Sequence, residues 1–271
     1  MPWRLRRDTL LMLARPPLIV FSDLDGTLLD HDTYAWDAAK PALTRLALLG
    51  CPVILTSSKT AAEITVLQAD MALDAYPAIV ENGAGVIGLE EAETEHSTYS
   101  KLRSLLDKAP KNLRAQFTGF GDVDVDALAV LTGLSTGAAT LARKRDFSEP
   151  GLWSGSSDEK AAFLDHLSTQ GVFATQGGRF LTLSFGATKA DGMARVLRRF
   201  DAERCVALGD APNDITMLEA ADYGVIIANP HRAPLPPLNG EDEGRISRTL
   251  DAGPLGWNTA VCALLDTLEL T

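Results

Sequence analysis

Short, continuous apolar runs alternate with helical patterns in two separate parts of the sequence, and this alternation restricts the possible folds more than any other feature. The runs have the character of strands buried on both faces, and they occupy residues 18–22, 51–58, 77–84, 205–210 and 223–227. Helical patterns lie between them, at 37–49, 60–71, 189–200 and 213–221. Strands that alternate with helices pair in parallel through right-handed crossovers. The sequence therefore predicts a doubly wound, mostly parallel α/β sheet.

The region between these two parts has a different character. It begins near Gly88 with a polar stretch, and its helical and β-like patterns are mixed without regular alternation, at 127–135, 158–170, 171–176 and 179–185. We therefore expect an inserted α+β domain at residues 89–186, and a discontinuous parallel domain made of residues 1–88 and 187–271. Near the end of the chain, the Pro/Gly-rich stretch 228–244 predicts a long loop, and a final helix is expected from about Thr259.

Charge and composition exclude several classes of partner. The formal net charge of −11 repels phosphate backbones and anionic lipids, which argues against nucleic-acid or membrane binding. The first 17 residues have arginines followed by a short apolar stretch, but residues 14–17 interrupt it before the first strand, so we do not expect a secretion signal. The three cysteines are far apart and odd in number, which fits a reducing compartment. We expect a cytoplasmic protein, whose oligomeric state the sequence leaves open.

Chemically reactive side chains follow the apolar runs, where the predicted strands end, or begin the helix after the insertion. They are Asp23 and Asp25 in "DLDGTL", Ser57 and Ser58 in "TSSK", Lys189 in "TKADG", and Asp210, Asn213 and Asp214 in "GDAPND". Sites of open parallel sheets gather at the carboxyl ends of the strands. Carboxylates from two strand ends suit Mg²⁺, which would offset their repulsion toward a phosphate dianion. One aspartate could then attack phosphorus while another gives a proton to the leaving alcohol.

These four motifs, in this order, resemble those of the haloacid dehalogenase superfamily of phosphotransferases. The resemblance implies that Asp23 is the nucleophile and Asp25 the general acid and base. It also implies that Ser57 and Lys189 bind the transferring phosphoryl group, although Ser58 could replace Ser57 as the hydroxyl donor. A lone aspartate at a strand end is usually a turn former, and a lone lysine at a helix start is usually solvated. The interpretation depends on their combination.

The same resemblance implies a metal site and a covering domain. Asp23, the backbone carbonyl of Asp25 and Asp210 would hold Mg²⁺, with Asp214 in support and Asn213 helping to order the site. In this superfamily, an α/β insertion between the second and third motifs is a cap that closes over the site and selects the leaving group. The inserted domain is therefore expected to determine the substrate.

Several stretches resemble the mannosyl-3-phosphoglycerate phosphatases more narrowly. They are "ENGAGVI", "FTGFGDVDVDALAVLTGLS", "RKRDFSEP", "GGRFLTLSFGATKADG" and "GPLGWNTAV". This resemblance implies hydrolysis of mannosyl-3-phosphoglycerate to phosphate and mannosylglycerate, a compatible solute. A glucosyl-3-phosphoglycerate phosphatase, a broader sugar-phosphate phosphatase and a non-catalytic binding protein on the same fold are the alternatives.

The phosphorylated sugar-glycerate carries a carboxylate and many hydroxyls, so an acidic protein must supply local cations and hydrogen-bond donors. Arg179, which follows two glycines, is a candidate for the carboxylate, and Arg145 for the sugar. Arg145 could equally form a surface salt bridge, and Glu149 in the same stretch could contact the sugar or brace the cap. Further substrate contacts are expected from Ser58, Asn82 and Asn213, although Asn82 could as easily complete a turn.

Overall fold

The computed structural model describes residues 15–89 and 95–270 of the chain. Its central sheet has five parallel strands in the order β11-β10-β9-β1-β2. These strands are β1 (Ile19–Ser22), β2 (Val53–Leu55), β9 (Cys205–Gly209), β10 (Tyr223–Ala228) and β11 (Ile246–Ala252). The predicted fold class, a mostly parallel α/β sheet with an inserted α+β part, is confirmed.

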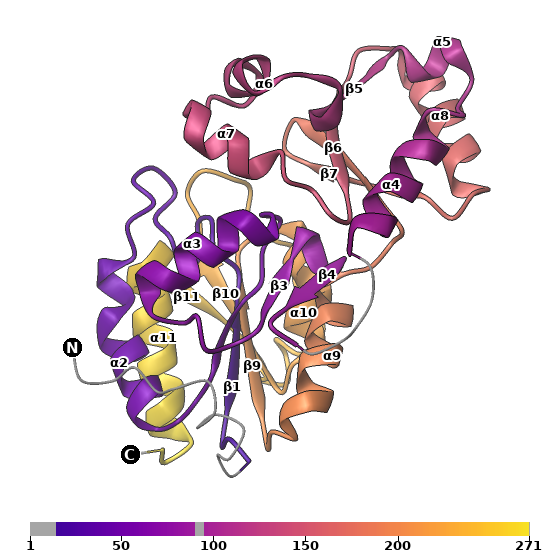
Figure 1. Cartoon of the computed structure of the whole chain (residues 1–271). Helices are drawn as coiled ribbons and strands as arrows, with labels where there is room; N and C mark the ends of the chain where they lie inside the picture. Colours follow the sequence, from indigo (N-terminus) through magenta and orange to yellow (C-terminus); the bar gives the residue numbers. More distant parts are fainter. Residues whose placement is uncertain (1–14, 90–94, 271) are drawn as a thin grey trace.

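Helices cover both faces of this sheet (Figure 1). The 3-10 turn η1 (Asp37–Ala39) and helices α2 (Lys40–Leu48), α3 (Ala61–Met71) and α11 (Gly253–Thr267) pack on one face, and α9 (Lys189–Phe200) and α10 (Ile215–Ala220) pack on the other. Successive side chains of β1 point to opposite faces, so Val20 joins the first core and Phe21 the second. All four β1 residues are buried, which explains the continuous apolar run.

A small hairpin continues the structure beyond β2. Strand β3 (Ala78–Val80) meets the end of β2 through one parallel bridge, Thr56 to Ile79, and pairs antiparallel with β4 (Gly85–Ile87). Between β3 and β4 lies the 3-10 turn η2 (Glu81–Gly83). The chain leaves the parallel domain after β4 and returns to it at α9.

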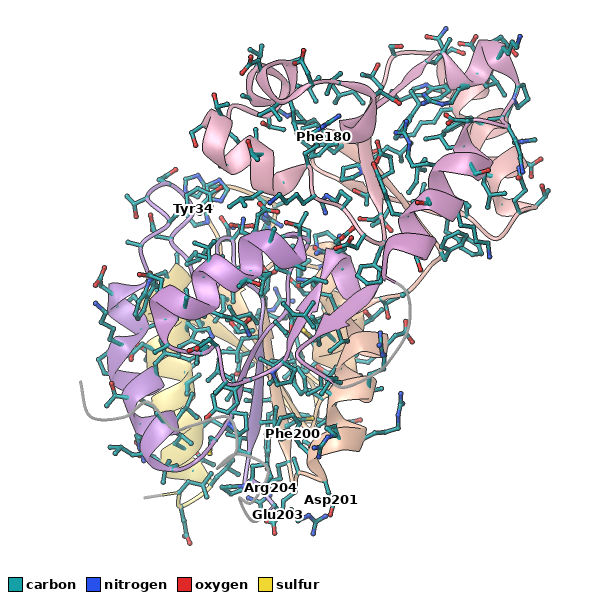
Figure 2. The ribbon with its side chains drawn as sticks, viewed as in Figure 1. Tyr34, Phe180, Phe200, Asp201, Glu203 and Arg204 are labelled. Carbon is teal, nitrogen blue, oxygen red and sulfur yellow. The ribbon has the colours of Figure 1, made fainter. Side chains whose placement is uncertain are left out.

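The intervening part, which we call the cap, contains a four-stranded antiparallel sheet in the order β5-β6-β8-β7. Its strands are β5 (Phe117–Gly119), β6 (Glu149–Trp153), β7 (Phe173–Gly177) and β8 (Phe180–Ser184). Its helices are α4 (Glu95–Leu106), α5 (Lys111–Arg114), α6 (Val125–Thr132), α7 (Thr136–Ala142) and α8 (Ser157–Ser168), with the 3-10 turn η3 (Phe120–Asp122). The residues just before β9 lie far from the cap, while Tyr34, beyond the end of β1, lies close to it (Figure 2). The carboxyl ends of the parallel strands therefore face the cap.

The end of the chain departs from expectation in two places. Strand β11 was not anticipated, because it is an edge strand, most of whose side chains are exposed, and it lacks a continuous apolar run. Helix α11 begins at Gly253, earlier than the expected Thr259. The stretch "GPLGWN" suggests a loop, but Pro254 sits in the first helical turn, where its missing N–H is harmless.

The leader-like stretch at the start of the chain falls largely on residues 1–14, outside the described residues. Within the described part, no single helix has the length and hydropathy to cross a membrane; α6 and α7 together would pass this test, across a bend of 100°. The three cysteines are free thiols, and burial raises the pKa of Cys51 to about 11 and that of Cys205 to about 12.

A buried carboxylate fastens the cap to the parallel domain. Glu81, in η2, is 2% exposed and accepts hydrogen bonds from the backbone N–H groups of Asp146 (2.9 Å) and Ser148 (2.8 Å). The hydroxyl of Ser148 donates to the same carboxylate at 2.6 Å. A buried carboxylate needs such partners, since an unpaired one would be costly to desolvate. Glu81 therefore fixes the place where the cap chain passes the end of β3.

The close approach of η2 to α9 leads to a prediction about stability. Gly83 has a φ of 95°, and a Cβ there would overlap the backbone carbonyl of Thr188, the residue before α9. We expect Gly83→Ala to lower the free energy of unfolding by about 3 kcal/mol, through backbone strain and the overlap together. Urea unfolding followed by circular dichroism measures this loss.

Gly133 provides the matched control for this substitution. Its φ is 81°, but a Cβ at this position would have no atom of the described residues within 4 Å beyond its own chain neighbours. Gly133→Ala should therefore cost only about 1 kcal/mol, for the left-handed backbone alone. Equal losses in the two variants would show that the contact between η2 and Thr188 contributes nothing.

Candidate active site

The centre of the site is an ammonium group buried between two carboxylates. Lys189 Nζ lies 2.6 Å from Asp23 Oδ1 and 2.6 Å from Asp214 Oδ1, and the lysine side chain is fully buried. Thr188 and Asp191 form a capping box that starts α9 at this lysine. Burial alone would lower the pKa of Lys189, but the two carboxylates raise it above its ordinary value. The lysine therefore stays charged.

Asp214 is oriented by the backbone as well as by the lysine. Its second oxygen accepts hydrogen bonds from the N–H groups of Asp210 (3.0 Å) and Ala211 (2.9 Å). Burial, together with the charge of Asp23, raises the pKa of Asp214 to about 6, although Lys189 opposes the shift. Asp214 thus ties the turn after β9 to the start of α9.

Asp210 is held by three groups from two loops. Its Oδ1 accepts a hydrogen bond from the hydroxyl of Thr27 (2.9 Å), and its Oδ2 accepts one from Asn229 Nδ2 (2.7 Å). Arg232 Nε lies 3.1 Å from the same Oδ2. Burial and the charge of Asp23 raise the pKa of Asp210. Neither Asn229 nor Arg232 was a predicted site residue, because their Pro-rich loop carries no periodic signal that places it near β1.

The three carboxylates of Asp23, Asp210 and Asp214 are suited to a hard cation. Their nearest oxygens lie within 4.8 Å of one another, and all three residues are buried. Burial, followed by the charge of Asp23, raises the pKa of both other carboxyls. Clustered carboxylate oxygens are typical ligands of Mg²⁺. The donor set therefore fits the predicted metal.

Asp25 points into the site beside this cluster. Its Oδ2 accepts a hydrogen bond from Lys59 Nζ at 2.8 Å, and that ammonium also lies 5.4 Å from the ring centre of Tyr34. Among the described residues, the other oxygen of Asp25 is buried without a hydrogen-bond partner. Burial disfavours the charge of Lys59, but Asp25 outweighs this effect and raises its pKa. Lys59 follows the two predicted serines directly, yet its role was not predicted.

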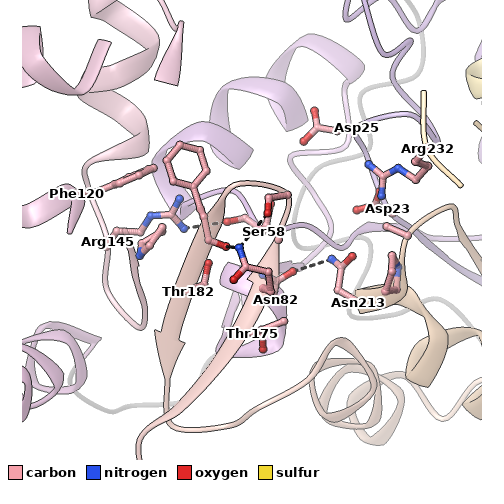
Figure 3. A pocket seen from close by; sticks show the side chains of 17 residues that line it. Asp23, Asp25, Ser58, Asn82, Phe120, Arg145, Thr175, Thr182, Asn213 and Arg232 are labelled. Carbon is pink, nitrogen blue, oxygen red and sulfur yellow. Dashed lines mark hydrogen bonds between the residues drawn. The ribbon is translucent and has the colours of Figure 1, made fainter. Parts of the chain in front are cut away.

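A cavity of about 410 Å³ lies between the cap and the carboxyl ends of the strands (Figure 3). The parallel domain lines it with Asp23, Asp25, Ser58, Asn82, Ala211, Pro212, Asn213 and Arg232. The cap lines it with Phe120, Arg145, Pro150, Thr175, Gln176, Gly177, Gly178, Phe180 and Thr182. The hairpin of β7 and β8 was predicted as two strands, but its role as a wall of the cavity was not.

Some of the predicted phosphate-binding and substrate-binding residues line the cavity, and others do not. Ser58 lines the cavity, while Ser57 is buried and its hydroxyl accepts the N–H of Lys59 at 3.2 Å. Asn82 and Asn213 both line the cavity and share a hydrogen bond of 3.0 Å (Figure 3). Asn82 also has a left-handed backbone, so it completes a turn and faces the cavity at once.

The two predicted arginines have different positions. Arg145 lines the cavity, donates from Nη1 to the carbonyl of Ser58 at 2.9 Å, and lies over the ring of Phe120. Arg179 is not among the cavity-lining residues and donates to the carbonyl of Thr132 at 2.7 Å. Its predicted contact with a substrate carboxylate would require another side-chain conformation.

Glu149 belongs to the interior of the cap. It is fully buried and accepts hydrogen bonds from Tyr99 (2.5 Å), Arg103 (2.9 Å) and the N–H of Gly121 (2.8 Å). Of the two roles considered for it, the geometry favours bracing of the cap over contact with a sugar.

Residues 17–222 match the family model of haloacid dehalogenase-like hydrolases. The chain belongs to this family. The match includes β1 with Asp23 and Asp25, the whole cap, α9 with Lys189, and the turn with Asp210 and Asp214. The match thus covers the four motifs and the parallel domain as far as α10, while β10, β11 and α11 lie beyond it.

Solved structures with the same fold include phosphatases of this hydrolase superfamily. BT1666 from Bacteroides thetaiotaomicron has a TM-score of 0.62 at 18% identity, over 93% of this chain and 95% of that one. The subclass IIB sugar phosphatase BT4131 has a TM-score of 0.60 at 17% identity, with coverage of 93% and 99%. The sucrose-phosphatase of Synechocystis sp. PCC6803, solved with sucrose and phosphate, has a TM-score of 0.61 at 15% identity, with coverage of 94% and 99%.

The buried lysine of this hydrolase leads to a prediction about stability and pH. We expect Lys189→Met to lower the free energy of unfolding by about 3 to 5 kcal/mol near pH 8, because it leaves buried carboxylates without their cation. Lys189 lowers the pKa of Asp214, so we expect its removal to raise that pKa further. A carboxyl group whose pKa is raised in the folded state costs stability as the pH increases above its ordinary pKa of 3.8. The loss of stability in Lys189→Met should therefore shrink as the pH falls toward 3.8.

Denaturant unfolding at several pH values measures this loss, and Lys59→Met is the matched control. Its ion pair with Asp25 is partly exposed, so its removal should cost about 1 kcal/mol or less. A loss for Lys189→Met that is equally small, or that grows as the pH falls, would contradict the assigned charge balance.

Proposed function

We propose that the protein is a Mg²⁺-dependent phosphatase of phosphorylated sugars, with mannosyl-3-phosphoglycerate as its substrate. The observation that carries the proposal is the pairing of buried Lys189 with Asp23 at the floor of a cavity that Asp25 also lines. A nucleophilic carboxylate, a second carboxyl beside it and a fixed cation are what phosphoryl transfer through an aspartyl-phosphate needs. Membership of the hydrolase family supports the same reaction class.

In this mechanism, Asp23 attacks phosphorus, and the bond from phosphorus to the sugar-glycerate oxygen breaks. Asp25, in its protonated form, gives its proton to that leaving oxygen. The Asp25 carboxylate then takes a proton from the water that attacks the aspartyl-phosphate, which releases phosphate and restores both groups. The buried Asp25 oxygen, which has no hydrogen-bond partner among the described residues, is the atom we assign to this proton. Lys189 and the hydroxyl of Ser57 or Ser58 hold phosphoryl oxygens.

The cation is assigned to the carboxylate cluster. Asp23, the backbone carbonyl of Asp25 and Asp210 would hold Mg²⁺, and Asp214 would support them. When bound, Mg²⁺ supplies charge neutralisation between the aspartates and the incoming phosphate. Thr27 and Asn229 already orient Asp210 through hydrogen bonds, so the chain's own residues preorganise this ligand.

The substrate assignment depends on the cavity walls. Two structural neighbours are described as a sugar phosphatase and a sucrose-phosphatase, which supports a sugar phosphate in general. The hairpin of β7 and β8 offers neutral hydroxyl groups from Thr175 and Thr182, and these suit sugar hydroxyls. Arg145, whose Nη1 also lies 3.9 Å from Glu81 Oε2, supplies a cation for the glycerate carboxylate. Glucosyl-3-phosphoglycerate presents the same groups and is the main alternative, followed by a broader range of sugar phosphates.

The first test removes the nucleophile. We expect Asp23→Asn to reduce Mg²⁺-dependent release of phosphate by at least about a thousandfold, because an amide neither attacks phosphorus nor replaces the anionic ligand. Phosphate release is measured in a coupled assay, with circular dichroism as the check on folding. Asp165→Asn, an exposed acid on α8, is the control and should retain full activity. Turnover by Asp23→Asn at the wild-type rate would rule out this mechanism, whereas absence of phosphate release by the wild type would favour a binding protein without this chemistry.

The second test separates the substrate classes. Mannosyl-3-phosphoglycerate should have a higher kcat/KM than glucose 6-phosphate, which lacks a carboxylate. Arg145→Ala should reduce kcat/KM for the glycerate ester by about 10- to 100-fold more than for glucose 6-phosphate, since a charge-assisted bond is lost only with the former.

The comparison between substrates controls for damage to the cap. Arg145 also binds the carbonyl of Ser58, so any effect on cap position lowers both rates together. An equal loss for both substrates would overturn the assignment of the carboxylate to Arg145. A hexose phosphate that matches the glycerate esters would instead favour the broader phosphatase.

A further inference from the structure

Two histidines from distant parts of the sequence stack at the cap-facing edge of the parallel domain. The rings of His31 and His231 have centroids 4.1 Å apart and planes within 18° of parallel. Asp32 Oδ2 lies 3.6 Å from His231 Nε2. One ligand atom from each of the three residues lies within 4.8 Å of the others. Tyr34, three residues after His31, marks this edge in Figure 2.

Both loops that carry these side chains are held by their own hydrogen bonds. Asp30 Oδ1 accepts the N–H of Thr33 at 2.9 Å and the hydroxyl of Thr33 at 2.7 Å, which fixes the turn containing His31 and Asp32. On the other side, the N–H of His231 donates to Asn229 Oδ1 at 2.9 Å. The three donors are thus presented by ordered backbone, while their exposed side chains keep the freedom to close around an ion.

We propose that His31, Asp32 and His231 form a second metal site, for a transition metal ion of the Zn²⁺ class. Two imidazole nitrogens and one carboxylate oxygen are a common donor set for Zn²⁺, whereas Mg²⁺ prefers oxygen alone. The buried cluster of Asp23, Asp210 and Asp214 offers only oxygen and shares no residue with this site. The two sites therefore differ in the ions they select.

The second site is connected to the first through one short segment. Asn229 accepts the N–H of His231 through its Oδ1 and donates through its Nδ2 to Asp210 Oδ2 at 2.7 Å. Arg232, the residue after His231, contacts the same Asp210 oxygen at 3.1 Å. An ion that fastens His231 to the loop after β1 would therefore also restrain two groups that hold Asp210.

The test is a calorimetric titration of the full-length, tag-free protein with Zn²⁺, in excess Mg²⁺ so that the carboxylate cluster is occupied. We expect one equivalent of Zn²⁺ to bind. His31→Ala and His231→Ala should each weaken this binding by at least about tenfold, since each removes one of three ligands. Circular dichroism confirms that these variants are folded.

His166→Ala is the matched control, because His166 lies on α8 in the cap and contacts Gln170 instead of the proposed site. It should bind Zn²⁺ as the wild type does. Asp23→Asn should also keep this binding, so the result does not depend on whether the protein is a phosphatase. Absence of Zn²⁺ binding, or an equal loss in His166→Ala, would overturn the proposal.

Discussion

The contact of Lys189 with Asp23 and Asp214 is the constraint on which the rest of the site depends. A fully buried ammonium is tolerated only when opposite charges and hydrogen bonds replace its hydration, so β1, α9 and the turn after β9 must meet at this point. Parallel pairing of β1 with β9 brings their carboxyl ends side by side. Gly83 lets η2 pass directly against Thr188, at the start of α9. The position of the lysine thus links three elements that are far apart in the sequence.

The features that the sequence predicted well are those with local causes. Strand β1 is buried on both faces, so it had to be a continuous apolar run, and the Thr60 capping box marks the start of α3. Helix α9 covers the same residues as predicted, 189–200, because its apolar face repeats with the helical period. The fold class followed from such patterns. The four motifs were found because each stands beside an element that the sequence defines.

The features that were missed depend on contacts across long sequence separations. Arg232 and Asn229 reach Asp210 only because β10 lies next to β9. No pattern in their own Pro-rich loop indicates that these two strands are neighbours. Edge strand β11 has little apolar surface because so little of it packs against other elements. Arg179 was predicted to begin a strand but lies in the turn between β7 and β8, and the direction of its long side chain is decided by the carbonyl of Thr132, 47 residues earlier. Such choices are properties of the assembled fold.

The two walls of the cavity also differ in how far their chemistry can be inferred. The floor presents Asp23, Asp25 and Arg232, and the charges of a phosphoryl group and a cation demand residues of these types. Among the described cap residues, 95–186, Arg145 is the charged one that lines the cavity, and the other polar side chains there are neutral. Mannose and glucose differ in the orientation of one hydroxyl. Whether a threonine or glutamine forms a hydrogen bond with that hydroxyl depends on its side-chain rotamer and not on its residue type. The reaction type can therefore be predicted from the residue types of the cavity floor, whereas the choice between mannose and glucose depends on side-chain placement in the cap.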